Sequence, residues 1–222
     1  MLCILCHLPL KLNWGICSQC ASHFPYLPST CPVCGLPLSD LKQPCHFCKK
    51  LQFKWDNLIA VADYKPPFPK LIQQFKSYNK VEYGYAFSRL LFINWYYQRL
   101  QNKVFKPDLI TCIPLHHHRY WQRGYNQSEL LAKPLAKWIK CDYQPYLLSR
   151  TVNRSDQKML SKTLRQTNIS HAFDCQKELT GKTIAIVDDV ITTGSTMNEA
   201  CRLLKLCGAT KIQVLCLCRT SL

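Results

Sequence analysis

Four CxxC pairs in the first 48 residues constrain the fold of this chain more than any other feature. They recur every 14 residues, as Cys3/Cys6, Cys17/Cys20, Cys31/Cys34 and Cys45/Cys48. A CxxC turn lets two thiolates reach one ion, and two such turns complete the tetrahedral sulfur cage that Zn²⁺ prefers. The eight cysteines therefore predict two structural zinc sites. The metal would supply the folding energy that about 50 residues cannot obtain from a core of their own.

The spacing leaves the pairing of these ligands open. The simplest arrangement is consecutive, with the first four cysteines on one ion and the last four on the other. A cross-braced arrangement is compatible with the same spacing, and iron–sulfur ligation is a secondary alternative. His7, His23 and His46 flank the turns, but four thiols at each site leave these histidines no vacancy.

Composition indicates a folded chain with a polyanionic partner. The 222 residues are 47% hydrophobic, enough for one medium domain and a small appendage, and the net charge is +16. Such a charge favours nucleic acid, a membrane surface or a phosphorylated substrate as partner, unless the chain is merely basic. The first residues do not resemble a signal peptide, and no apolar stretch reaches the length of a membrane span. With thiols free for metal, we expect a reducing, cytoplasmic compartment.

Strands and helices alternate after residue 50. The apolar patterns predict strands at 58–64, 108–115, 182–190 and 211–218, and helices at 67–79, 81–100, 127–139 and 195–208. This alternation is typical of βαβ units and predicts an α/β fold with a parallel sheet covered on both faces. We divide the chain into a cysteine-rich module, residues 1–50, and an α/β domain, residues 51–222.

The stretch VDDVITTGST, residues 187–196, is typical of a sugar-phosphate site. Asp188 and Asp189 follow an apolar strand, and a hydroxyl-rich turn with Gly194 leads into the next helix. In open α/β sheets ligands bind beyond the carboxyl ends of the strands, where turn amides and a helix N-terminus can surround a phosphate. Carboxylates beside a phosphate need neutral hydrogen-bond donors, and ribose hydroxyls are the natural ones. A divalent ion could also lie nearby.

Two nucleotide motifs and one structural alternative compete with this interpretation. The tripeptide GKT at 181–183 resembles the end of a P-loop motif. However, Gln176 occupies the position where that motif requires glycine, and the next predicted element is a strand where the motif requires a helix. No GxGxxG is present among the seven glycines, so a dinucleotide site is unsupported. An acidic strand end followed by a capped helix remains the structural alternative.

The segment IAIVDDVITTGST, residues 184–196, resembles the PRPP-binding motif of type I phosphoribosyltransferases. The whole chain resembles the ComF family (ComFC and GntX-like proteins), with further matching stretches at 112–132 and 148–173. The resemblance implies a double zinc-ribbon module before a phosphoribosyltransferase-like domain. It implies that Asp188 and Asp189, as catalytic residues, contact the ribose 2′- and 3′-hydroxyls. The 5′-phosphate would lie on the loop residues Thr192, Thr193, Gly194, Ser195 and Thr196, and Mg²⁺ could accompany PRPP.

The loop that follows Pro114 corresponds, by the same resemblance, to the pyrophosphate loop. The usual family version reads close to HPRRxxxRGFNQ, whereas here His117 replaces the proline and Arg119 alone remains of the paired basic residues. Guanidinium groups suit diphosphate oxygens, so Arg119 and Arg123 are the expected pyrophosphate ligands.

A basic segment with interleaved aromatics indicates single-stranded DNA binding. Residues 106–170 hold eleven Lys/Arg against four Asp/Glu, a pattern that attracts phosphates while aromatic rings stack on bases. A solvated basic loop is the alternative for residues 150–168. The expected nucleic-acid contacts are Tyr120, Trp121, Arg123, Lys158 and Arg165.

Family members serve natural competence by acting on incoming DNA in the cytoplasm, so the resemblance implies a competence protein that handles this DNA and binds PRPP or a related ribose phosphate. A DNA-uptake helicase is left open as a partner. One alternative is an active phosphoribosyltransferase that acts on an unidentified base or small molecule. The other is a zinc-stabilised scaffold with a relic site.

Overall fold

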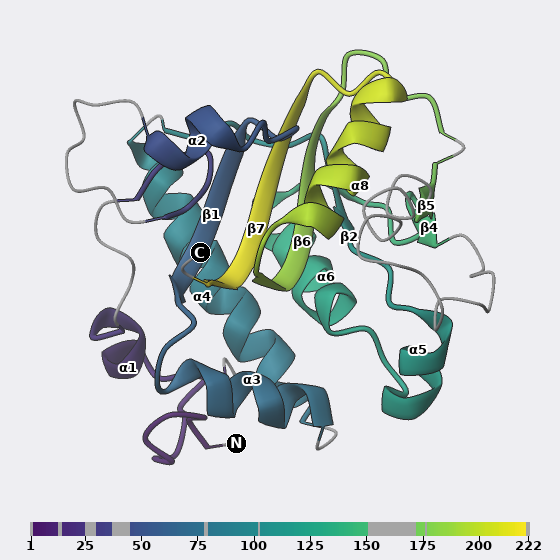
Figure 1. Cartoon of the computed structure of the whole chain (residues 1–222). Helices are drawn as coiled ribbons and strands as arrows, with labels where there is room; N and C mark the ends of the chain where they lie inside the picture. The colour runs from purple at the N-terminus through teal and green to yellow at the C-terminus, as the bar shows by residue number, and fades with distance from the viewer. Residues whose placement is uncertain are drawn as a thin grey trace.

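A five-stranded sheet, parallel throughout, forms the centre of the protein in a computed structural model. The structure describes residues 2–12, 15–24, 30–36, 45–77, 80–101, 103–150, 172–175 and 177–220. In sheet order the strands are β1 (Asn57–Asp63), β7 (Lys211–Arg219), β6 (Thr183–Ile191), β2 (Leu109–Cys112) and β3 (Asp142–Tyr143) (Figure 1). A separate antiparallel pair joins β4 (Ser149–Arg150) to β5 (Phe173–Asp174). The predicted parallel α/β fold is confirmed.

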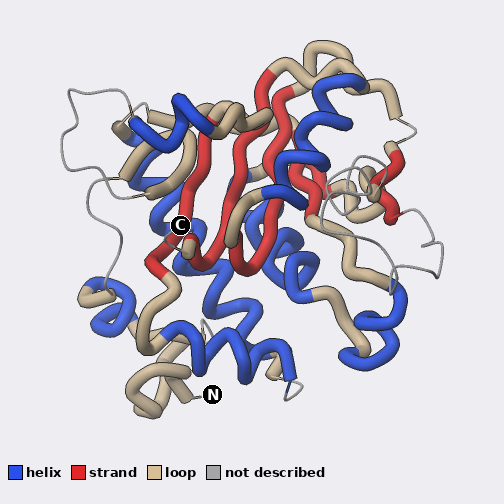
Figure 2. The backbone as a smooth tube through the Cα atoms, in the orientation of Figure 1, coloured by secondary structure: helices blue, strands red, loops and turns tan. Residues whose placement is uncertain are grey.

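Helices cover both faces of the sheet, as Figure 2 shows by the blue helices on either side of the red strands. The described helices are α1 (Ser18–Ser22), α2 (His46–Lys50), α3 (Phe68–Ser77), α4 (Glu82–Leu100), α5 (His117–Arg123), α6 (Gln127–Ile139) and α8 (Ser195–Leu206). Helices α3, α4 and α6 pack with one face, through strand residues such as Ile59 and Val61. Helix α8 packs on the other face, which carries Leu58 and Ala60. Alternate strand residues therefore fill two separate cores.

The point where the chain changes direction across the sheet lies between β2 and β6. From β2 the chain continues through α6 to β3 at one edge, and from β6 it continues through α8 to β7 on the opposite side. Strand β2 pairs with β6 only as far as Cys112, opposite Val187. Beyond that pair β6 continues to Ile191 and pairs with β7 alone. Such a switch point opens a crevice at the carboxyl ends of the strands.

One sequence expectation needs correction. We expected a loop after Pro114, and residues 117–123 form helix α5 instead. Asp188 and Asp189 lie near the end of β6, as expected, and the strand ends at Ile191, one residue beyond the predicted bound. The other predicted helices and strands occur within a few residues of their expected bounds. No helix in the described ranges is long and apolar enough to cross a membrane.

Candidate functional site

A pocket of about 230 Å³ lies at the carboxyl ends of β2 and β6. Its lining residues belong to the end of α3, the loop after β2, helix α5, the first turn of α6, β4, the end of β6 and the start of α8. Figure 1 labels these elements. The polar side chains that line it belong to Lys76, Arg119, Arg123, Asn126, Gln127, Ser128, Arg150, Asp188, Asp189, Thr192, Thr193, Ser195 and Thr196. The two aspartates, the hydroxyl-rich turn and both arginines singled out by the sequence therefore surround one cavity.

The turn that leads into α8, the candidate anion-binding turn, forms one wall of this pocket. Gly194 is the N-cap of the 12-residue helix α8 and supplies no side-chain cap. Thr193 Oγ1 accepts a hydrogen bond of 3.3 Å from Ser195 N and lies 2.9 Å from Ser195 Oγ. Thr192, Thr193, Ser195 and Thr196 are exposed. Hydroxyl groups and a helix N-terminus, which carries partial positive charge, therefore line the same wall.

Glycine is required at position 194 for two reasons. Its φ of 82° lies in the left-handed region that side chains rarely adopt. A Cβ at this position would also lie only 3.0 Å from the Trp55 ring. Trp55 stacks on Phe53 at a centroid distance of 4.4 Å, so an aromatic pair supports the turn from behind.

Asp188 is half-buried, and its carboxyl group accepts two hydrogen bonds. Its Oδ1 accepts from Ser128 Oγ at 2.8 Å and from Asp189 N at 2.9 Å. Burial, followed by the charge of Asp189, raises the pKa of Asp188 to about 7, against the opposing effects of Ser128 and Lys76. The carboxyl group therefore keeps its proton to a higher pH than an ordinary aspartate. No sequence pattern indicates that Ser128 contacts it.

Asp189 forms an ion pair with Lys76, in the last turn of α3. The Lys76 side chain is 29% exposed and that of Asp189 is 12% exposed. The ammonium group neutralises an acid that would otherwise repel a phosphorylated ligand in the same pocket. Sequence reasoning missed Lys76 because a single lysine at a helix end carries no recognisable pattern.

Helix α5 and the turn after it bring the two predicted arginines to the pocket. Gly124 ends α5 with a φ of 73°. Asn126 begins α6, because its Oδ1 accepts from Ser128 N at 3.0 Å while its Nδ2 donates to Ile113 O at 3.0 Å. Arg123 donates to Gln127 Oε1 at 3.0 Å. This tight connection keeps the guanidinium group of Arg123 at the pocket rim, and Arg119 precedes it by about one helical turn.

Arg150 adds a third guanidinium group to the pocket. Its Nε donates to Pro114 O at 2.9 Å, and its guanidinium lies 5.1 Å from the centroid of the Phe173 ring. Burial, and then the charge of Arg119, lower the pKa of Arg150. A half-buried arginine close to another arginine favours an anion near both.

The structure describes some of the predicted nucleic-acid contacts. Tyr120 and Trp121 lie on α5 and are 48% and 76% exposed, so two aromatic rings flank the arginine side of the pocket. Lys158 and Arg165 lie outside the described residues, as does most of the basic segment 150–168.

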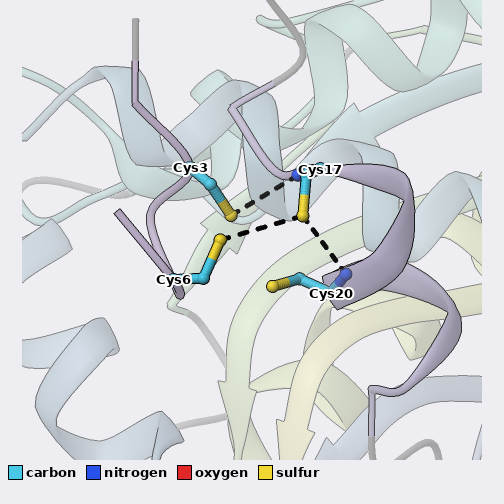
Figure 3. Close-up of side chains that lie close together, drawn as sticks. All are labelled: Cys3, Cys6, Cys17 and Cys20. Carbon is cyan, nitrogen blue, oxygen red and sulfur yellow. Dashed lines mark hydrogen bonds between the residues drawn. The ribbon is translucent and has the colours of Figure 1, made fainter. Parts of the chain in front are cut away.

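The eight N-terminal cysteines form two separate clusters. Sulfur atoms of Cys3, Cys6, Cys17 and Cys20 lie within 4.8 Å of one another, and the same holds for Cys31, Cys34, Cys45 and Cys48. Figure 3 shows the first cluster, where the Cys6 and Cys17 Sγ atoms are 3.9 Å apart. In the second, the Cys31–Cys48 and Cys34–Cys45 separations are both 3.5 Å. The S–S edge of a tetrahedral zinc site is about 3.8 Å, so both clusters can bind zinc with the consecutive pairing.

Each cluster combines a turn with a short helix. In the first, Cys3 and Cys6 lie on a turn whose next residue, His7, has a φ of 58°, and Cys17 accepts a hydrogen bond from Cys20 N at the start of α1. In the second, Gly35 takes the place of His7 with a φ of 70°. The two halves of the cysteine-rich segment therefore repeat one local structure.

The thiols of each cluster cannot all ionise without a cation. Burial opposes ionisation of Cys3, but hydrogen bonds from the backbone of Cys6 and Cys17 lower its pKa to about 6. Burial, and then the neighbouring thiols, raise the pKa of Cys20 and Cys48. One dication among four sulfur atoms removes this mutual repulsion, which fits the donor set to Zn²⁺.

Comparison with known proteins finds a matching domain family and relatives that match almost the whole chain. The family model of the phosphoribosyl transferase domain matches residues 126–221. The DNA utilization protein YhgH of Escherichia coli (strain K12) is 42% identical over 99% of this chain and 97% of its own. Competence protein F of Haemophilus influenzae is 35% identical, over 96% of this chain and 94% of its own. The chain belongs to the ComF family.

Among solved structures, the fold comparison finds a purine phosphoribosyltransferase from Pyrococcus horikoshii Ot3. The matched region covers 55% of this chain and 67% of the chain of that structure, with 17% sequence identity and a TM-score of 0.35.

The pocket of this ComF-family chain is lined by residues inside and outside the segment that the family model matches. The domain match begins at Asn126, so it includes Ser128, both aspartates and the turn 192–196. It excludes Lys76, Arg119 and Arg123, which precede it in the chain. The described pocket therefore combines residues of the matched domain, Arg150 among them, with three cationic side chains that precede it in the chain.

Proposed function

We propose that this ComF-family protein handles incoming DNA during natural competence in the cytoplasm, and that its phosphoribosyltransferase-like domain binds PRPP or a related ribose 5-phosphate. One observation carries the proposal. A single pocket holds a helix N-terminus with a hydroxyl-rich turn, two carboxylates and three arginines. A phosphorylated sugar with a second anionic group is the ligand class that presents matching groups to all three.

Each wall of the pocket suits one part of such a ligand. The turn 192–196 would take the 5′-phosphate, because its hydroxyls and the α8 N-terminus donate hydrogen bonds. Asp188 and Asp189 would accept hydrogen bonds from the ribose hydroxyls. Arg119 and Arg123, with Arg150 behind them, would hold a diphosphate. Mg²⁺ bound with PRPP would neutralise further diphosphate charge, and the two clusters would hold structural zinc.

Single-stranded DNA binding is the second part of the proposal. The relatives named above are a DNA utilization protein and a competence protein. On this chain, Tyr120 and Trp121 are exposed beside Arg119 and Arg123 on α5, which supports a surface for stacked bases and phosphates. Lys158 and Arg165 would extend this surface, and a DNA-uptake helicase is the proposed protein partner.

A calorimetric titration with PRPP and Mg²⁺ tests the sugar-phosphate site. We expect binding by the native protein and its loss in the Asp188→Asn/Asp189→Asn variant, with the zinc content unchanged. Asp142→Asn is the matched control, because Asp142 is exposed at the opposite end of the sheet in β3. Equal affinities in the double variant and the control would rule out this pocket.

DNA binding is tested by titrating fluorescent single-stranded DNA at increasing salt. We expect affinity to fall with salt, and the salt slope to decrease in an Arg123→Gln/Lys158→Gln variant, because fewer phosphate contacts release fewer counterions. Affinity that is independent of salt would contradict the proposal.

An active phosphoribosyltransferase is the alternative, favoured by the presence of two acids and three arginines around one pocket. In that reaction a nucleophile forms a bond to ribose C1 as the C1–O bond to pyrophosphate breaks. The arginines would stabilise charge on the leaving group, and the carboxylates would stabilise positive charge on the ribose. Pyrophosphate release from PRPP, measured with a panel of bases, would favour the enzyme; tight PRPP binding without release would favour the binding role.

A further inference from the structure

The second cysteine cluster touches the anion-binding turn through two buried side chains. Both use backbone carbonyl groups of the turn that carries Cys31 and Cys34. Trp55 donates its indole N–H to Val33 O at 2.6 Å. Arg219, at the end of β7, donates through Nε to Cys34 O at 3.0 Å. The same turn is further fixed to the sheet edge, where Leu58 N donates to Pro32 O at 2.8 Å.

The same two side chains reach the two ends of the segment that precedes α8. Arg219 donates through Nη1 to Ile191 O at 3.1 Å, at the end of β6. The Trp55 ring lies behind Gly194, so close that a Cβ there would approach it to 3.0 Å. A neighbour of Trp55 adds a third contact, because Lys54 N donates to Asn198 Oδ1 at 2.7 Å in the first turns of α8.

Both bridging side chains are rigidly held. Arg219 is fully buried and Trp55 is 4% exposed. A buried guanidinium group depends on its carbonyl acceptors, since water cannot replace them. A displacement of the Cys31–Cys34 turn would therefore remove acceptors from Arg219 and Trp55 and leave both free to shift against the anion-binding turn.

Metal would further restrict the conformation of that turn. Cys31 and Cys34 would be two of the four ligands of one ion, and Val33 lies between them. Without the ion, the turn keeps its own hydrogen bonds, such as Gly35 N to Cys31 O at 2.9 Å, and the bond from Leu58 N to Pro32 O, but loses the two thiolate anchors. Coordination of Cys31 and Cys34 would thus order the carbonyl acceptors that Arg219 and Trp55 use.

The first cluster makes different contacts in the described part of the chain. Gly15, within its cysteine-bearing segment, packs against Ala86 of α4, and Ile16 O accepts a hydrogen bond from Arg89 of α4. Phe24 packs edge-on against Phe68, the first residue of α3, at a centroid distance of 5.1 Å. These contacts lie on the opposite face of the sheet from α8, so the first cluster is a natural control for the second.

We propose that Trp55 and Arg219 are positioning residues that couple metal at the second cluster to ligand binding at the anion-binding turn. Metal at this cluster holds the turn 191–194 in its binding conformation, and metal at the first cluster does not. Coupling between two binding sites is reciprocal, so a phosphorylated ligand must also slow the loss of this metal ion. The ligand half of this inference rests on the proposed sugar-phosphate function.

Two single-ligand variants compare the clusters in the full-length protein. Cys48→Ser removes one ligand from the second cluster, and Cys20→Ser removes one from the first; both residues are half-buried and follow the start of a short helix. We expect PRPP affinity to fall at least about fivefold in Cys48→Ser, within the usual range of allosteric coupling, and to change less than about twofold in Cys20→Ser. Equal effects of the two substitutions would overturn the inference.

Zinc release measures the coupling in the opposite direction. The Cys20→Ser variant retains the second ion, and Cys48→Ser retains the first. We expect PRPP to slow zinc transfer to a chelator in Cys20→Ser and to leave the rate unchanged in Cys48→Ser. Adding Trp55→Leu to Cys20→Ser should keep the zinc but reduce the PRPP effect, since only the Arg219 bridge would remain. A PRPP effect that is undiminished in Trp55→Leu would contradict the role of this residue.

Hydrogen exchange tests the coupling without any ligand. We expect the amides of residues 191–197 to exchange faster in Cys48→Ser than in Cys20→Ser. If the native protein fails to bind PRPP but this difference is found, the sugar-phosphate function is wrong and the structural coupling stands. If PRPP binds and exchange in 191–197 is the same in both variants, the function stands and the coupling is overturned.

Discussion

Lys76 and Asp189 form an ion pair that links the last turn of α3 to the middle of the ligand pocket. Asp189 belongs to β6, whereas Lys76 comes from a helix more than a hundred residues earlier in the chain. The pair therefore fixes α3 against the carboxyl end of the sheet while it neutralises one of the two pocket acids.

We expect Lys76→Met to lower the free energy of unfolding by about 1–3 kcal/mol, because Asp189 would keep a largely buried charge without its partner. Chemical denaturation monitored by tryptophan fluorescence measures this change. The double variant Lys76→Met/Asp189→Asn should recover most of the loss. Lys65→Met, which breaks the more exposed pair with Asp63, is the control and should have little effect. A loss that persists in the double variant would contradict the ion-pair explanation.

Asp188 should make the stability of the protein depend on pH. Its pKa is about 7 in the folded protein and about 3.9 in an unfolded chain, so the folded state binds the proton more tightly. The stability associated with Asp188 is fully present below pH 3.9 and is lost as the pH rises to about 7. Asp188→Asn carries no charge and escapes this loss.

The melting temperature of Asp188→Asn, compared with that of the native protein, checks this sign. We expect the difference in favour of the variant to grow between pH 4 and 7 and to reach several degrees at pH 8. The variant should bind PRPP poorly even though it is more stable. A native protein that is more stable than Asp188→Asn at pH 8 would show that Ser128 and Lys76 outweigh the cost of burial.

Gly194→Ala should weaken phosphate binding beyond its backbone cost. Gly181 is a matched control, since its φ of 77° is close to that of Gly194, yet a Cβ at position 181 meets nothing within 4 Å. Each alanine should cost about 1–2 kcal/mol for the left-handed conformation. Only Gly194→Ala, which also displaces Trp55, should reduce the affinity for PRPP in calorimetry. Equal affinities in the two variants would show that the turn tolerates a side chain.

Native mass spectrometry can establish the metal content and the pairing together. We expect two zinc ions in the native protein and one in each of Cys3→Ser and Cys31→Ser. The double variant Cys3→Ser/Cys17→Ser should also retain one ion, because both residues serve the same cluster. Loss of both ions from this double variant would indicate cross-braced pairing.

Trp121→Ala tests whether α5 contributes stacking to DNA binding. A stacked base contributes about 1–3 kcal/mol, so affinity for single-stranded DNA should fall between about fivefold and 150-fold. Tyr97→Ala, which removes an aromatic ring that is 62% exposed on α4, should leave it unchanged. Fluorescence anisotropy with a short oligonucleotide measures both. The same small change in both variants would exclude stacking on α5.

The sequence predicts the sheet well because its strands are continuous apolar runs and its helices have clear periodicity. Strand β6 and helix α8 are examples. The turn between them is rich in hydroxyl residues and contains a glycine, a composition typical of a phosphate site. Helix α5 was missed because HHRYWQR, residues 117–123, has no apolar stripe, and most of its described side chains are exposed. A short helix that packs little of its surface leaves no periodic pattern to detect.

Contacts between distant segments could not be predicted in the same way. Lys76, Trp55 and Arg219 each contact the pocket or its support, but none belongs to a local motif. Arg219 in particular ends an apolar strand, where sequence reasoning sees only a final charged residue. Its burial depends on carbonyl groups of residues 34 and 191, which no pattern along the chain brings together.

The position of β1 at the edge of the sheet has a consequence for how the protein is made. In the described sheet β1 pairs with β7 alone, and β7 follows every other strand in the chain. During translation the second cysteine cluster and β1 leave the ribosome well before β7, yet Arg219, which contacts Cys34, and the strand that pairs with β1 both belong to β7. The second cluster must therefore persist for most of synthesis without part of its docking surface, whereas the first cluster packs on α3 and α4, which are made early.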